Sequence, residues 1–205
     1  MSAHRAGSAA ARYPADVVEV NKPHVTREAY LARERAASER STLWRGEVRA
    51  MTGASLVHNV ISSNIHGLLF SRLMGTPCRP LSQDMRVHVP ATGGYVYPDV
   101  LVVCGKPELE DEAFDTLLNP SVIIEVLSDS TRRFDREEKY SAYKSIASLR
   151  EYVLVEQDRP WVEVLTRTDD GWLSRDYAAG ADVRLTSLAL EIPMDEICRD
   201  ALSAS

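Results

Sequence analysis

Two apolar runs that each carry one carboxylate most constrain what this chain can fold into. The first run covers residues 97–104 and has Asp99 near its start, and the second covers residues 122–128 and has Glu125 inside it. Both runs are rich in β-branched residues, which is typical of buried strands. A carboxylate in a buried strand costs free energy unless it is paired or binds a cation. Two of them on consecutive strands therefore predict one shared site.

The length and charge of the chain limit its organisation. With 205 residues it can bury one hydrophobic core, which predicts a single domain over residues 24–205. Residues 1–23 are rich in Ala and Ser without periodicity, and we expect them to form a mobile N-terminal tail. The formal net charge of −6 argues against a surface coated with basic residues, although a local basic patch can still bind nucleic acid.

Cysteine usage and hydropathy bear on the compartment. Cys78, Cys104 and Cys198 are scattered without a CxxC spacing, which argues against both a zinc site and a disulfide framework. No apolar run approaches the roughly 18 residues of a membrane span, and the N-terminal segment lacks the apolar core of a signal peptide. These features predict a soluble cytoplasmic protein in a reducing compartment, with no membrane partner.

Apolar periodicity and turn residues predict an α+β fold. A helix is expected from a cap at Thr26 to about Ser38, an amphipathic helix over 55–73, and a third helix capped by Asp135, with Glu138 at the capping-box position. Strands are expected over 42–51, 84–89, 97–104, 121–127, 151–156, 161–166 and 172–177. We predict a mixed sheet flanked by helices, with the Asp99 and Glu125 strands at its centre.

Charge patterning distinguishes two segments near these strands. Residues 105–118 contain five acids against the single base Lys106, so we expect this loop to lie away from any nucleic-acid cleft. Residues 130–150 contain six bases and three acids, which suits either phosphate contact or a solvated helix face. In the strand over 84–89, alternation predicts Val87 and Val89 inside and Arg86 on the other face.

Asp99 and Glu125 together are suited to divalent-metal chemistry. Carboxylate oxygens held by a rigid sheet are the ligands that magnesium prefers, and metal-assisted phosphodiester hydrolysis uses such a site. Taken singly, Asp99 can simply cap a strand and Glu125 can pair with a buried arginine. Their positions on neighbouring strands favour the shared metal site.

Such chemistry also needs a cation near the attacking water or the phosphate. In a common arrangement a lysine lies two residues after the second carboxylate, but here Leu127 occupies that position. Lys139 lies about one turn into the following helix and can reach back to the strand end. Lys144 is more than a turn further along and faces elsewhere, so Lys139 is the predicted cation.

Three further residues are auxiliary candidates. His58 lies on the amphipathic helix, where it is either a proton shuttle or support for a metal ligand, or a capping or core histidine. Glu47 and Asp84 can each add a carboxylate to the site, or form salt bridges with Arg86 or Arg49.

Several short motifs, in this order and spacing, make the chain similar to a known family. They are Gly46-Glu47-Val48, Gly53-Ala54-Ser55 with His58-Asn59, Asp84-Met85-Arg86-Val87, Tyr97-Pro98-Asp99, Asn119-Pro120, Glu125-Val126-Leu127-Ser128, Ser130-Thr131, Asp135 with Lys139, Ser148-Leu149-Arg150-Glu151-Tyr152 and Gln157-Asp158. Over residues 26–197 the chain resembles the Uma-two putative restriction endonuclease family, within the PD-(D/E)XK nuclease superfamily.

This resemblance implies a restriction-endonuclease-like fold and a divalent metal, usually magnesium, with manganese as the alternative. It places the superfamily's metal-binding Asp and Glu at Asp99 and Glu125, and Lys139 is the natural substitute for the lysine missing at Leu127. The expected function is a metal-dependent endonuclease acting on DNA, or on RNA. Cleavage of both strands of a duplex favours a homodimer. The alternative is a catalytically inactive module that keeps this fold and binds nucleic acid or a protein partner.

Overall fold

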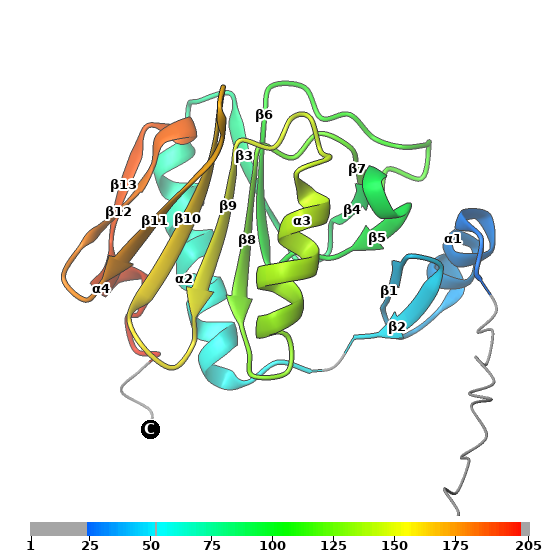
Figure 1. Cartoon of the computed structure of the whole chain (residues 1–205), viewed down its shortest axis with the longest axis horizontal. Helices are drawn as coiled ribbons and strands as arrows, with labels where there is room; N and C mark the ends of the chain where they lie inside the picture. The colour runs from blue at the N-terminus through cyan, green and yellow to red at the C-terminus, as the bar shows by residue number, and fades with distance from the viewer. Residues whose placement is uncertain (1–23, 52, 202–205) are drawn as a thin grey trace, which may run out of the picture.

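A six-stranded mixed sheet is the largest unit of the computed structural model, which describes residues 24–51 and 53–201 (Figure 1). Its strand order is β11-β10-β9-β8-β6-β3, with β8 and β9 parallel and the other pairs antiparallel. The strands are β3 (Cys78–Ser82), β6 (Val100–Cys104), β8 (Val122–Leu127), β9 (Glu151–Glu156), β10 (Trp161–Thr168) and β11 (Gly171–Ala178). The α+β prediction is confirmed. Strand β6, which follows Asp99, and strand β8, which contains Glu125, are both internal strands of the sheet. The expected tail at 1–23 lies outside the described residues.

Helix α2 (Leu56–Leu73) covers one face of this sheet. Ser55 caps it by accepting a hydrogen bond from the backbone N–H of His58 at 3.1 Å. One stripe of the helix, formed by Ile61, Ile65, Leu69 and Leu73, is buried in a core with β6, β8 and β9. The predicted amphipathic helix is therefore correct, except that Leu56, expected on the apolar face, is largely exposed.

A second helix packs on the opposite face of the sheet and is drawn beside β8 in Figure 1. It comprises the π-helical segment η2 (Phe134–Lys139) and α3 (Tyr140–Tyr143). The expected N-cap at Asp135 is wrong. The first turn begins earlier, since the N–H of Arg132 donates to the carbonyl of Ser128 and the N–H of Asp135 donates to the carbonyl of Thr131. Asp135 thus lies inside the helix, where its side chain is buried.

A second sheet lies beside the first, with the strand order β2-β1-β5-β4-β7. Its strands are β1 (Ser41–Trp44), β2 (Glu47–Ala50), β4 (Arg86–Val89), β5 (Gly94–Val96) and β7 (Thr116–Leu117). The single strand expected over 42–51 is wrong, because Arg45 and Gly46 form a two-residue turn between β1 and β2. Both have positive φ angles, 49° and 80°, which suits a tight hairpin. The turn η1 (Pro90–Thr92) joins β4 to β5.

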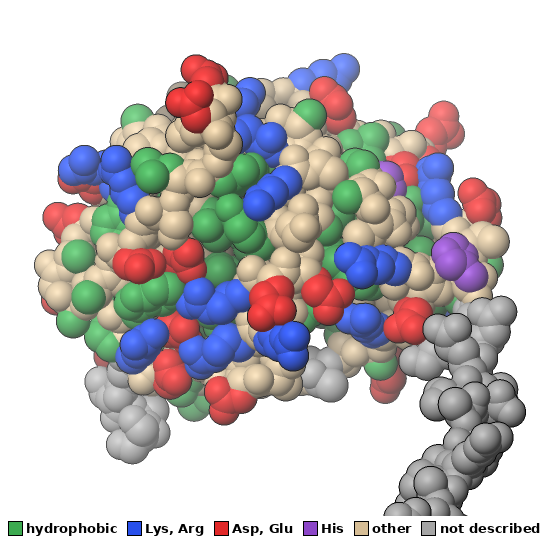
Figure 2. Space-filling view, in the orientation of Figure 1, with side chains coloured by type: hydrophobic (Ala, Val, Ile, Leu, Met, Phe, Trp, Pro, Cys, Tyr) green, Lys and Arg blue, Asp and Glu red, His purple; other side chains and the backbone are tan. Residues whose placement is uncertain are grey.

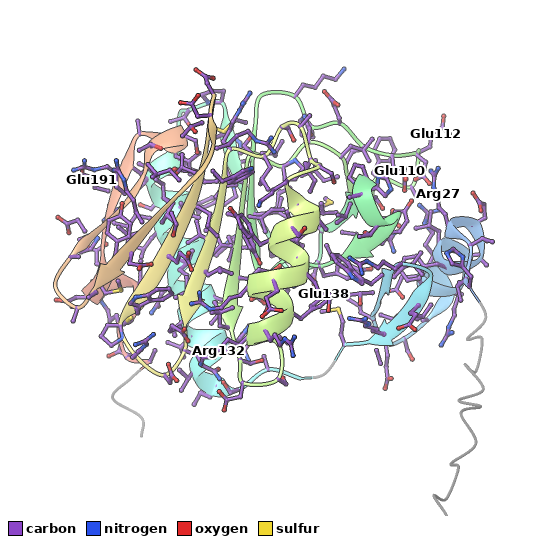
Figure 3. All side chains as sticks on the ribbon, viewed as in Figure 1. Arg27, Glu110, Glu112, Arg132, Glu138 and Glu191 are labelled. Atoms are coloured by element: carbon purple, nitrogen blue, oxygen red, sulfur yellow. A yellow bond between two sulfur atoms is a disulfide. The ribbon has the colours of Figure 1, made fainter. Side chains whose placement is uncertain are left out.

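Helix α1 (Arg27–Ala36) packs on this second sheet, with Thr26 as its N-cap, as predicted. The acidic segment before β7 is bound largely by arginines of this region. Arg35 contacts Asp111 at 2.8 Å and Asp115 at 2.9 Å. Arg27 contacts Glu110 at 2.9 Å, and both are labelled in Figure 3. Hydrogen bonding to Arg35 holds the pKa of Asp115 well below its usual range, against the effect of burial.

Arg86 is the clearest departure from the alternation expected in β4. Val87 and Val89 are buried as predicted, but Arg86 is buried as well. Strand β7 pairs in parallel with β4 and brings acceptors to the guanidinium, which donates to Asp115 at 2.6 Å and to the hydroxyl of Thr116 at 3.0 Å. A cation with this many partners can be buried in place of an apolar side chain.

The chain ends in the hairpin β12 (Asp182–Leu185) and β13 (Leu190–Pro193), joined by η3 (Thr186–Leu188), and the short helix α4 (Met194–Ile197). The buried carboxylate of Glu151 in β9 anchors η3 by accepting hydrogen bonds from the backbone N–H groups of Thr186 and Ser187. None of the helices within residues 24–51 and 53–201 is long and apolar enough to cross a membrane.

Cys78 and Cys104 form a disulfide that the sequence analysis argued against. Antiparallel pairing of β3 with β6 places the two residues directly opposite each other, although 26 positions separate them in sequence. Spacing alone carries no sign of this pairing, because the register of the two strands decides it. The bond joins the edge strand β3 to the end of β6 that is remote from Asp99.

Packing of α2 on the sheet gives a direct test of the fold. Leu69 is 0% exposed, whereas its neighbour Phe70 is 57% exposed. Replacing a fully buried leucine by alanine removes apolar contacts and leaves a cavity, so Leu69→Ala should lower the free energy of unfolding by about 2–5 kcal/mol. Phe70→Ala, the matched control, should change it by less than about 0.5 kcal/mol. Denaturant unfolding followed by circular dichroism measures both, and equal effects would contradict this packing.

Candidate active site

Asp99 and Glu125 meet across the β6–β8 pair. The register joins Val100 to Ile124, Leu101 to Ile123 and Val102 to Val122, and Asp99 lies directly before β6, where its side chain accepts a hydrogen bond from the backbone N–H of Val126, the residue after Glu125. The Asp99 carboxylate therefore lies at the point where β6 begins, close enough to Glu125 for its charge to raise the pKa of Glu125.

Two hydrogen bonds hold the Asp99 carboxylate. Its Oδ2 atom accepts from the backbone N–H of Val126 at 2.8 Å, and Nε2 of His58 lies 3.2 Å from the same oxygen. His58 is buried in the first turn of α2. Burial opposes protonation of the imidazole, but the hydrogen bond to Asp99 and the negative charges of Asp99 and Glu125 outweigh it and raise the pKa of His58. The structure thus brings His58 to the carboxylate pair.

Glu125 is buried between the sheet and the η2–α3 helix, with 3% of its surface exposed. Its Oε1 atom accepts two hydrogen bonds, from the ammonium of Lys139 at 2.9 Å and from the hydroxyl of Tyr143 at 3.0 Å. Burial raises the pKa of Glu125 to about 8; Lys139 opposes this shift, and the charges of Asp135 and Asp99 reinforce it. The carboxyl group therefore changes its charge in the neutral range.

Lys139 reaches two carboxylates from η2. Its Nζ atom lies 2.9 Å from Glu125 and 2.8 Å from Asp135, which precedes it by one helical turn. Burial disfavours the charged ammonium, but Asp135 and Glu125 outweigh that effect and raise the pKa of Lys139 well above its usual value. Lys144 faces elsewhere, with its ammonium 4.0 Å from the centre of the Tyr140 ring. The lysine that points at Glu125 is thus Lys139.

The two auxiliary carboxylates lie in different places. Asp84 is largely exposed and forms an ion pair with Arg40, so the structure does not bring it to the Asp99–Glu125 pair. Glu47 lies on β2, with its carboxylate 3.8 Å from Arg49. The Arg49 guanidinium in turn stacks over the ring of Phe134 in η2, 4.9 Å from its centre. Glu47 therefore belongs to the hairpin that flanks the helix carrying Lys139.

The side chain of Trp44 also connects the β1–β2 hairpin to the η2–α3 helix. Nε1–H of Trp44 donates to Glu138 at 3.2 Å, and the Trp44 ring packs edge-on against Phe134 at 5.0 Å. Figure 3 shows Glu138 on the side of the helix that faces β1 and β2. Glu138, expected in a capping box, instead joins the helix to β1 through Trp44.

The basic residues that follow β8 are largely occupied. Arg132 and Arg136 both contact the buried carboxylate of Glu156 at the end of β9, and Arg136 also contacts Glu163 at 2.7 Å. Figure 2 shows basic and acidic side chains intermixed over this part of the surface. These arginines anchor the helix to the sheet. Because acidic side chains lie among them, this surface does not support phosphate binding by residues 130–150.

Sequence reasoning missed two residues of the site, Asp135 and Tyr143. They lie four positions before and after Lys139, so all three share one face of a helix. That spacing was a usable signal, but the assignment of Asp135 as a cap placed it at the helix end instead of inside it.

The donor chemistry of this cluster fits a hard divalent cation. The carboxylates of Glu125 and Asp135 contact the ammonium of Lys139, and Asp99 adds carboxylate oxygens next to Val126 of the same strand as Glu125. Within residues 24–51 and 53–201, no group of three or more His, Cys, Asp or Glu side chains is arranged to hold a metal ion. Asp99 and Glu125 would thus supply two ligands and leave the others to water or substrate, as magnesium commonly accepts.

Comparisons with known proteins agree with this fold. The family model described as "Uma2: Putative restriction endonuclease" matches residues 27–195. Two uncharacterized proteins of Synechocystis sp. are similar in sequence. One, slr1290, is 32% identical over 86% of this chain and 93% of its own length; the other, sll1609, is 36% identical over 65% of this chain and 75% of its own length.

A solved structure shares the fold. It is the crystal structure of a putative nuclease belonging to DUF820 from Anabaena variabilis ATCC 29413. The match has a TM-score of 0.68 and 16% sequence identity, and it covers 83% of this chain and 96% of that one. The likeness confirms the predicted nuclease-like architecture of the sheet and its flanking helices.

The raised pKa of Glu125 predicts how stability depends on pH. Between about 4.5 and 8 the unfolded chain loses this proton while the folded chain keeps it, so ionisation favours unfolding as the pH rises. The free energy of unfolding of the wild type, minus that of Glu125→Gln, should therefore fall across this window by up to about 1.4 kcal/mol per pH unit. Denaturant unfolding at several pH values measures this difference. A difference that stays constant or rises would contradict the assignment.

Proposed function

Since this chain belongs to the Uma2 family, described as putative restriction endonucleases, we propose that it is a metal-dependent endonuclease that hydrolyses phosphodiester bonds in DNA. One observation carries the proposal. Two carboxylates at neighbouring strand positions, Asp99 just before β6 and Glu125 in β8, lie close together, and the ammonium of Lys139 contacts Glu125 at 2.9 Å. Hard anionic ligands beside a fixed cation are what hydrolysis of a phosphodiester requires.

Asp99 and Glu125 are the proposed ligands of Mg²⁺, or of Mn²⁺ in its place. When bound, such an ion supplies a water of lowered pKa and offsets charge on the phosphate. Both contacts of the Asp99 carboxylate, with Val126 N–H and with His58, are made by Oδ2, and both hydrogen bonds to Glu125 are accepted by Oε1. The second oxygen of each carboxylate is the proposed ligand atom.

Lys139 supplies the protein's own positive charge. Its ammonium is the proposed hydrogen-bond donor to a non-bridging phosphate oxygen, or to the attacking water. The helix that crosses the sheet brings this ammonium to Glu125. Leu127, at the usual position of the lysine, cannot supply a charge, because it is apolar and is buried in the core under the same helix. A fixed ammonium in a site of low dielectric stabilises developing negative charge more strongly than one in water.

His58 and Glu47 have proposed supporting roles. His58 orients Asp99 through the 3.2 Å contact with Oδ2, and its imidazole is positioned to exchange a proton with that carboxylate. Glu47 lies on the hairpin beside η2, where its proposed role is to hold Arg49, which stacks over Phe134 of η2. Asp84 has no proposed role, since it is held at the surface by Arg40.

The proposed substrate is duplex DNA, with RNA as the alternative. Two-fold symmetry would place one copy of the site on each strand, so we propose that the active species is a homodimer. A module that binds nucleic acid or a protein without cleaving it is the competing function. Such a module would bind DNA but would not nick it, even with metal present.

Nicking of a supercoiled plasmid tests the proposal. The wild type should convert the plasmid to open-circular and linear forms with Mg²⁺ or Mn²⁺ and lose this activity with a chelator. Asp99→Asn and Glu125→Gln should each lose it as well, because each removes one proposed ligand. No nicking by the wild type with either metal would overturn the function and favour the binding module.

Lys139 and Lys144 form a matched pair on one helix. Lys139→Ala should still bind metal in calorimetry, because both carboxylates remain, but its cleavage rate should fall by about 100-fold or more. Lys144→Ala should cleave at nearly the wild-type rate, because its ammonium packs on Tyr140 instead of Glu125. Wild-type cleavage by Lys139→Ala would show that another group supplies the positive charge.

A further inference from the structure

One ammonium is shared by two buried carboxylates in this site. Nζ of Lys139 donates a hydrogen bond to Glu125 at 2.9 Å and forms an ion pair with Asp135 at 2.8 Å; both carboxylates are buried, and 12% of the Lys139 side chain is exposed. The two carboxylates differ in origin, because Glu125 belongs to the sheet and Asp135 to the same helix as the lysine. The ammonium can therefore stay beside one carboxylate when the other binds a different cation.

The proposed function creates that situation at Glu125. A divalent cation bound there would repel the neighbouring ammonium, since two positive charges in a poorly solvated site interact strongly. With no second partner, the lysine would be driven out of the site just when its charge is required.

We propose that Asp135 is a positioning residue that retains Lys139 in the site while Glu125 binds the metal. This rests on the proposed function. The Asp135–Lys139 pair is then a fixed unit of the helix, and the Lys139–Glu125 contact is the exchangeable one. Asp135 itself makes no contact with substrate or metal in this arrangement.

The surroundings of Asp135 suit a fixed partner. The residue is 2% exposed, and the hydroxyl of Tyr152 in β9 donates to its carbonyl at 3.1 Å, which pins this turn of the helix to the sheet. The i, i+4 spacing with Lys139 keeps the two side chains adjacent whatever occupies Glu125. Movement of the helix is not needed for the exchange.

Tyr143 supports the same division of roles. Its hydroxyl donates to the Oε1 atom of Glu125 at 3.0 Å, on the oxygen that Lys139 also contacts. When the lysine turns to Asp135 alone, this hydrogen bond remains on the carboxylate. Glu125 therefore keeps its orientation without the ammonium.

Kinetics of three variants test the proposal in the full chain. Asp135→Asn should lower kcat by about 100-fold, close to the loss in Lys139→Met, and should leave KM for DNA within about twofold. The double variant should be no worse than Lys139→Met alone, because both changes remove the same ammonium from the site. A merely structural role of Asp135 would instead add its loss to that of Lys139→Met.

Nuclear magnetic resonance gives a readout that does not depend on cleavage. The chain has four lysines, Lys22, Lys106, Lys139 and Lys144, so their side-chain ammonium signals can be assigned by replacing each with arginine. Buried, ion-paired ammonium protons exchange slowly with water. In the wild type the Lys139 signal should shift but persist when Mg²⁺ saturates the site. In Asp135→Asn the same addition should broaden it beyond detection.

The outcomes separate this proposal from the proposed function. If the wild type fails to cleave DNA, the function is wrong, whatever the lysine signal shows. If the wild type cleaves and Asp135→Asn cleaves within about threefold of it, the role of Asp135 is wrong. Should Asp135→Asn fail to fold, the wild type alone decides: loss of the protected Lys139 signal on saturation with Mg²⁺ would overturn the proposal.

Discussion

The buried carboxyl group of Glu125 is the constraint on which the candidate site depends. A carboxylate inside a central strand is costly unless other groups compensate for it, and here the compensation comes from the helix that crosses the sheet. Lys139 and Tyr143 both reach Glu125 from that helix, and Asp135 holds the lysine from one turn earlier. The helix in turn is fixed by Tyr152, by Trp44 and by the arginines on Glu156. Much of the packing around β8 therefore serves to hold one ammonium beside one carboxylate.

This arrangement explains how the cation can move from the strand to the helix. A lysine two residues after Glu125 would extend from the same face of β8, but Leu127 there is buried in the core under the helix. The ammonium of Lys139 approaches the same carboxylate from above the sheet. What the chemistry requires is the position of the charge, and a neighbouring element can supply it as well as the strand itself. The displaced lysine is thus compatible with the nuclease function proposed for this family member.

The sequence predicted the features that follow from local pattern and missed those set by tertiary pairing. The strands around Asp99 and Glu125, and the helix α2, came from β-branched runs and helical periodicity. The turn at Arg45–Gly46 was missed because it lies within a continuous strand-like pattern. The burial of Arg86 and the Cys78–Cys104 disulfide depend on which strands pair, and the sequence carries no sign of that register. In the site, the error about Asp135 came from treating a buried helical carboxylate as a cap, which hid its relation to Lys139.

The most direct test of the central claim is a crystal structure of the protein soaked with Mn²⁺, examined by anomalous diffraction. The account predicts an anomalous peak bound by carboxylate oxygens of both Asp99 and Glu125, with the remaining ligands being waters. It further predicts that the Lys139 ammonium remains in contact with Asp135. A peak at another place, or none at a Mn²⁺ concentration that supports plasmid nicking, would contradict the assignment of Asp99 and Glu125 as the metal site.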